Sequence, residues 1–115
     1  GLREYEKSVA ELISVVDKYP KSDYADDALE RAGTYLSGNL EDIEGGINLY
    51  QRVIEEYPES DNAPLAQYLL GALYMRTERW EEAKKIFQKV IEKYPGTELS
   101  TRAKNNLQKM LKRQK

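Results

Sequence analysis

A repeat of 37 to 38 residues constrains the fold of this chain more than any other feature of its sequence. Three similar segments carry it: VVDKYPKSDYAD, VIEEYPESDNAP and VIEKYPGTELST. Their prolines are Pro20, Pro58 and Pro95, which lie 38 and 37 residues apart. Large apolar residues coincide in the same alignment, at Leu12, Tyr50 and Phe87. A period of this length is typical of architectures in which successive units stack and bury their apolar faces together.

Each repeat has the pattern of two helices. Between Pro58 and Pro95, apolar residues fall at Ala66, Leu69, Leu70, Leu73 and Tyr74, and again at Trp80, Ala83, Ile86, Phe87, Val90, Ile91 and Tyr94. Both sets follow the i, i+3, i+4, i+7 spacing of one helical face. The proline that follows ends the second helix, because proline lacks an amide donor. No strand-like alternation competes. We therefore expect an all-α fold of about six antiparallel helices, near residues 3–18, 23–36, 41–56, 62–76, 79–93 and 98–113.

Glycines mark the turns and close contacts. Gly38-Asn39 is predicted to turn the chain between the helices of the first complete repeat. Gly46 aligns with Ala83, which indicates close helix packing. Its neighbour Gly45 has no such explanation, so we expect that turn to fray.

The composition argues against most enzyme classes. The chain has no cysteine and no histidine, so it lacks thiol nucleophiles, the commonest metal ligand and the usual proton shuttle at neutral pH. Its adjacent carboxylates, Asp26-Asp27, Glu41-Asp42 and Glu55-Glu56, would point away from one another on a helix. We predict no catalytic residues, no metal and no cofactor. No apolar run approaches the roughly 18 residues of a membrane span, so no membrane insertion is expected.

The second repeat resembles a tetratricopeptide repeat. The family pattern is W-x2-L-G-x2-Y, then A-x3-F, then P. Here it reads Gln67-x2-Leu70-Gly71-x2-Tyr74, then Ala83-x3-Phe87, then Pro95. The first repeat matches more loosely, at Gly33, Gly46, Tyr50 and Pro58. The resemblance implies one domain over residues 1–115. Within it, 1–20 would be the second helix of a partial repeat, 21–58 and 59–95 complete repeats, and 96–115 a capping helix.

The resemblance also implies a solenoid whose concave groove binds a peptide or protein, without catalysis. The family's groove positions correspond here to Asp27, Glu30 and Thr34, to Leu65, Tyr68, Ala72, Met75 and Arg76, and to Arg102, Asn105 and Lys109. Family members that clamp a chaperone's terminal carboxylate have lysine and asparagine where this chain has Glu30 and Thr34. A chaperone-tail adaptor is therefore not expected.

The link between repeats, YPxSxxA, is longer than usual in the family. It resembles bacterial cell-envelope members, namely the periplasmic protein associated with the Tol–Pal system and the lipoprotein of the outer-membrane β-barrel assembly machine. The resemblance implies a role in envelope assembly or cell division and a periplasmic or envelope location. The first residues of the sequence do not have the pattern of a signal peptide.

The charge is unevenly distributed. Residues 23–61 carry 11 acids and 2 bases, whereas residues 76–115 carry 12 bases and 5 acids. This distribution suggests two alternatives to a simple groove. Copies of the chain could associate end to end or through the first helix, where Val9 and Ile13 are predicted to leave apolar surface open. The basic last helix could bind nucleic acid weakly, although the overall charge of −2 argues against it.

Overall fold

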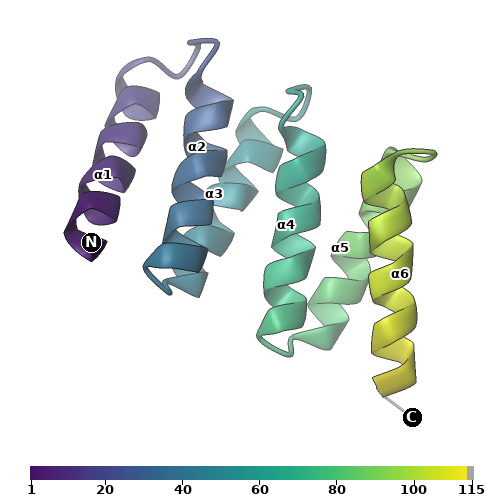
Figure 1. Cartoon of the computed structure of the whole chain (residues 1–115). Coiled ribbons are helices and arrows are strands. Elements are labelled where there is room, and N and C mark those ends of the chain that lie inside the picture. The colour runs from purple at the N-terminus through teal and green to yellow at the C-terminus, as the bar shows by residue number, and fades with distance from the viewer. Residues whose placement is uncertain (114–115) are drawn as a thin grey trace. The chain divides into compact units, whose positions relative to one another are not determined.

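The computed structural model describes residues 1–113, and these residues form an all-α repeat fold (Figure 1). The α-helices are α1 (Leu2–Lys18), α2 (Ala25–Thr34), α3 (Ile43–Glu56), α4 (Ala63–Arg76), α5 (Trp80–Lys93) and α6 (Glu98–Arg113). A π-helical turn, η1 (Tyr35–Asn39), directly follows α2. The predicted fold class is confirmed, and the described residues contain no strand. Each helix begins and ends within two residues of its predicted bounds, apart from the π-helical extension of α2.

The chain divides into two compact units, Gly1–Ala66 (unit 1) and Gln67–Lys115 (unit 2). The division falls within α4, and each unit is described by itself. In unit 1, α2 packs against both α1 and α3. The side chains of Val16, Leu29, Tyr50 and Val53 are fully or almost fully buried and form the centre of its core.

A glycine allows α2 and α3 to approach closely. A Cβ atom added to Gly33 would lie 2.9 Å from Cε1 of Tyr50, a separation that real Cβ atoms do not tolerate. The Tyr50 ring is buried against this glycine, and its hydroxyl forms a 2.8 Å hydrogen bond with Oγ1 of Thr34. The glycine of the first repeat is therefore explained by a ring on the neighbouring helix.

The extra residue of the first repeat is accommodated in η1. The amide of Leu40 donates to the carbonyl of Tyr35 over 3.0 Å, an i→i+5 bond that widens the last helical turn. The prediction that Gly38-Asn39 turns the chain was wrong, because both residues belong to η1. The left-handed conformation falls on Glu41 instead, with φ of 54°. Glu78 has the same role in unit 2, with φ of 60°.

Gly45 lies in a capped first turn, which corrects the expectation that this turn frays. Asp42 is the N-cap of α3, and its Oδ1 accepts a 2.9 Å hydrogen bond from the amide of Gly45. A Cβ atom at Gly45 would collide with the Asp42 carboxylate. The glycine is thus required to leave space for the capping side chain.

The YPxSxxA links of unit 1 are joined by hydrogen bonds across one repeat length. The Tyr57 hydroxyl donates to the carbonyl of Pro20 over 2.6 Å. Asp26 Oδ2 accepts from Oγ of Ser60 over 2.5 Å and from Nδ2 of Asn62 over 3.2 Å. Burial raises the pKa of Asp26, but these hydrogen bonds and those from backbone amides outweigh it, and the pKa is lowered.

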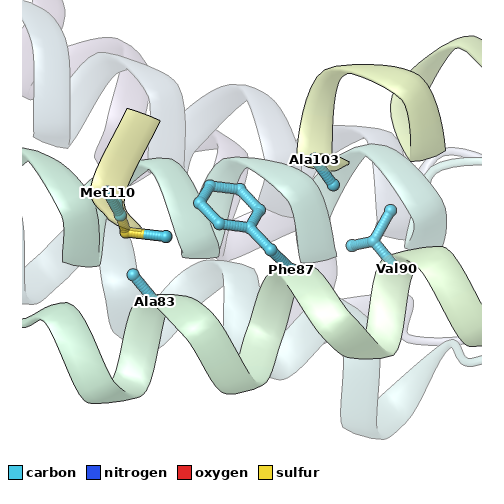
Figure 2. Close-up of a cluster of buried hydrophobic side chains, with 5 residues drawn as sticks. All are labelled: Ala83, Phe87, Val90, Ala103 and Met110. Atoms are coloured by element: carbon cyan, nitrogen blue, oxygen red, sulfur yellow. The ribbon is translucent and has the colours of Figure 1, made fainter. Parts of the chain in front are cut away.

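In unit 2, α5 packs against α6 around five buried side chains, which Figure 2 shows facing one another. Three belong to α5 and two to α6: Ala83, Phe87, Val90, Ala103 and Met110. A Cβ atom at Gly71 of α4 would lie 2.8 Å from Cε1 of Phe87. Gly71 and Phe87 therefore repeat the contact made by Gly33 and Tyr50.

We predict that Gly71→Ala lowers the free energy of unfolding by about 1–3 kcal/mol, because the fully buried Phe87 ring has no space to withdraw. Gly38→Ala is the matched control. No atom lies within 4 Å of its added Cβ, so alanine should raise stability by up to about 1 kcal/mol. Urea denaturation followed by circular dichroism measures both. Equal effects of the two substitutions would contradict the packing role of Gly71.

We also predict that Asp26→Ala destabilises the fold by about 1 kcal/mol at pH 7, through the loss of hydrogen bonds to a charged acceptor. Folding lowers the pKa of Asp26, so the stabilisation that its carboxylate provides is fully present at pH values above its ordinary pKa of 3.8. This stabilisation is lost as the pH falls through the lower pKa of the folded state. The difference from wild type should shrink in urea titrations at more acidic pH. Asp23→Ala, at an exposed position of the same link, should change little.

Candidate functional site

The groove positions predicted on α2 form a short polar chain in unit 1. Thr34 Oγ1 donates to Oε1 of Glu30 over 3.2 Å and bonds to the hydroxyl of Tyr50 over 2.8 Å. Glu30 and Asp27 are partly buried. Burial is the largest effect on Glu30 and raises its pKa, an effect that the charge of Asp27 reinforces, whereas the Thr34 hydrogen bond and the charge of Arg31 reduce it. Leu65, the remaining predicted residue of unit 1, is partly buried near the start of α4.

In unit 2, two predicted groove residues of α4 pack against the core. Tyr68 and Met75 contact the apolar cluster of α5 and α6. The Tyr68 ring lies 5.7 Å from that of Phe87, and its hydroxyl accepts a 3.1 Å hydrogen bond from Nδ2 of Asn106. The neighbouring residue of α6 that was predicted to line the groove is Asn105. Asn105 is exposed, and the adjacent Asn106 makes the contact.

The other predicted residues of unit 2 differ in their surroundings. Arg102 is exposed and pairs with Glu98 one turn earlier, with 2.8 Å between Nη2 and Oε1. Arg76 and Lys109 are exposed, and Ala72 is partly buried. Of these four, Lys109 lines a pocket together with Met75.

This basic pocket, of about 420 Å³, is lined by Met75, Trp80, Lys109, Met110, Lys112 and Arg113. Its apolar part comes from the end of α4, the start of α5 and a buried methionine of α6. Three cationic side chains of the last α6 turns line the pocket together with this apolar part. The guanidinium carbon of Arg113 lies 5.6 Å from the centre of the Trp80 ring, which places the cation in contact with the pocket's aromatic side chain.

The repeat pattern did not single out four residues that line this pocket, namely Trp80, Met110, Lys112 and Arg113. The repeat register could have identified two of them, because Lys112 and Arg113 follow Met75 and Arg76 by 37 residues. Trp80 had been assigned to the core, and it does pack partly buried against the apolar cluster of unit 2. Its contribution to a pocket requires the end of α6 beside it, which periodicity alone does not reveal.

Among residues 1–113, no group of three or more acidic side chains is arranged to hold a metal ion. None of the helices in that range has the length and apolar character needed to cross a membrane. The basic pocket offers apolar surface and positive charge, a combination suited to binding an anionic, partly apolar partner.

Comparison with known families gives the same assignment for each repeat. A family model described as tetratricopeptide repeat matches residues 27–60 and again residues 65–97, which together are more than half of the chain. The chain belongs to the tetratricopeptide repeat family. No curated protein matches the sequence significantly. The two family matches include α2 to α5, while α1 and α6 lie outside them.

Tetratricopeptide repeats generally mediate protein–protein interactions and are typically non-catalytic modules. The pattern of this family explains the shared helix pairs and the glycines at Gly33 and Gly71. It leaves the chemistry of the surface open, because repeats of one fold carry different side chains at their exposed positions. The partner must therefore be inferred from the charges and pockets of this chain.

We predict that Glu30→Gln stabilises the tetratricopeptide repeat of unit 1 at pH 7 by less than about 1 kcal/mol, since the carboxylate is only partly buried. Because folding raises the pKa of Glu30, this residue favours folding at pH values below its ordinary pKa of 4.5. That contribution to stability is lost as the pH rises through the higher pKa of the folded state. The amide keeps an acceptor for Thr34. The difference from wild type in urea titrations should vanish at acidic pH, and Glu59→Gln at an exposed position should show no such change.

Proposed function

We propose that this chain is a protein-binding module whose basic pocket holds an acidic peptide segment with one large apolar side chain. The observation that carries the proposal is the placement of Lys109, Lys112 and Arg113 around the apolar surface of Met75, Trp80 and Met110. Tryptophan, arginine and methionine are enriched at protein interfaces. The volume of about 420 Å³ is in the usual range for ligand pockets.

The charge of the lining residues selects the partner. The residues that line the pocket include three cations and no acid. A leucine or phenylalanine side chain would displace water from the Trp80 and Met75 surface, while flanking carboxylates would approach the lysines. Basic or purely polar peptides would lack one of these contributions and should bind more weakly.

The pocket contains its own spectroscopic reporter, because Trp80 is the only tryptophan of the chain. Titration with an acidic peptide of about ten residues containing a central leucine should change the Trp80 fluorescence. Lys112→Glu should weaken binding about tenfold or more, because it replaces attraction by repulsion beside the pocket. Lys89→Glu is the matched control, at an exposed position of α5 that does not line the pocket, and it should have a smaller effect.

Two comparison ligands make the result decisive. A peptide with the leucine replaced by serine tests the apolar contribution, and a short DNA duplex tests whether positive charge alone is sufficient. Preference for the leucine peptide over both supports the proposal. Tighter binding of DNA than of the peptide, or equal losses from Lys112→Glu and Lys89→Glu, would overturn it.

We propose further that this binding serves bacterial envelope assembly or cell division. The support is the long YPxSxxA link and its resemblance to envelope members of the family. Fractionation of the source cells, with the protein detected by an antibody, tests the location. Recovery in the periplasmic or membrane fraction would support the proposal, and recovery in the cytoplasm alone would contradict it.

A further inference from the structure

Unit 1 has an unfilled depression between α1 and α2, which we call the α1–α2 seat. It is lined by Ser8, Glu11, Leu12 and Val15 of α1, by Arg31 of α2 and by Tyr35 of η1, and its volume is about 280 Å³. Val15 is 41% exposed and Leu2 of the same helix is 61% exposed. The earlier expectation for Val9 was wrong, because this residue is buried and Ile13 partly so. The open apolar surface of α1 is therefore on the side of Val15.

The repeat register shows which kind of helix fits the seat. Leu12 has the repeat position of Tyr50 and Phe87, whose rings pack against Gly33 and Gly71 of the first helix in their repeats. α1 is thus a second-type helix. In unit 1, α1 packs on α2, the first helix of the next repeat, and on η1, while the seat beside Leu12 is open.

α6 is a first-type helix, and it has the features that the seat requires. Its Leu107 and Leu111 have the repeat positions of Ala32 in α2 and Leu36 in η1, and both of these elements pack on α3. Leu111 is 54% exposed. Gln108 has the position of the two core glycines. In the other repeats a glycine faces an aromatic ring, whereas here Gln108 would face Leu12 of the second chain. The larger Gln108 is matched by the smaller Leu12, so the combined size of the two facing side chains is preserved.

Charge favours the same pairing. Unit 1 contains 15 acidic and 6 basic residues, a net charge of −9, whereas unit 2 contains 5 acidic and 12 basic residues, a net charge of +7. We propose that the α1–α2 seat binds α6 of a second copy of this chain, so that α6 and α1 of two copies complete a repeat. The interface is heterologous, because each copy uses a different surface on each side.

This mode of association makes a specific prediction about size. Repeated head-to-tail docking should produce chains of copies that lengthen with protein concentration. Raising the salt from about 50 mM to about 500 mM should weaken the association, because the charges of both units are largely exposed. Sedimentation velocity at several concentrations measures both effects.

Two substitutions at exposed positions separate the two surfaces. Val15→Lys blocks the seat and leaves α6 intact, while Leu111→Lys blocks α6 and leaves the seat intact. Each variant alone should self-associate at least about tenfold more weakly. A mixture of the two should form one-to-one dimers, because the intact α6 of the Val15→Lys variant can bind the intact seat of the Leu111→Lys variant. These dimers should grow no further, because their other two surfaces are blocked. Ala10→Lys and Asn105→Lys, at exposed positions of the same helices that do not line the seat or align with Leu111, are the matched controls.

Circular dichroism would first establish that all four variants are folded. Recovery of a dimer only in the mixture would support the proposal, since neither a symmetric interface nor nonspecific attraction explains it. A wild-type chain that is monomeric at every concentration would overturn it and assign the seat to another segment or protein. Failure of the mixture to dimerise, or equal weakening by the control substitutions, would overturn it as well.

Discussion

A glycine packed beneath an aromatic ring sets the distance between helices in both units. At Gly33 and Gly71 an added Cβ atom would lie 2.9 and 2.8 Å from the facing ring, so only glycine permits these helices to approach. Whether the ring carries a hydroxyl then decides which residue stands next to the glycine in the sequence. Tyr50 has a buried hydroxyl that needs a partner, and Thr34 supplies it over 2.8 Å. Phe87 has no hydroxyl, and Ala72 stands where Thr34 stands in the first repeat.

This pairing affects the surface as well as the core. Thr34 also donates to Glu30, so the first repeat presents a hydrogen-bonded carboxyl at a predicted groove position. In the second repeat the same position is Tyr68, whose ring packs near Phe87 and whose hydroxyl accepts from Asn106. At this position the first repeat therefore presents a carboxyl group and the second a tyrosine packed near the core.

The sequence predicted the helices well because proline and apolar spacing act over a few residues. It failed where a side chain forms a contact that periodicity does not encode. The sequence offered no reason for Gly45, because the reason is a contact: the capping carboxylate of Asp42 occupies the space where a Cβ atom of residue 45 would lie. Gly38 looked like a turn residue, but the closure of the helix pair puts the left-handed conformation on Glu41. At the candidate site, Asn106 bonds to Tyr68, and the predicted residue Asn105 differs from it by about 100° around α6, so a shift of one residue changes the face.

The overall charge of −2 is a poor guide to what this chain binds. At physiological ionic strength the Debye length is about 8 Å, so a ligand near one surface responds mainly to the charges of that surface. Under the proposed function, the charge of +7 on unit 2 would therefore attract acidic ligands, whatever the sign of the whole chain. Unit 1 of another copy, at −9, is itself an acidic ligand of this kind. An acidic peptide and a second copy would consequently compete for the same positive field, even though the basic pocket and the Leu111 face of α6 are formed by different residues.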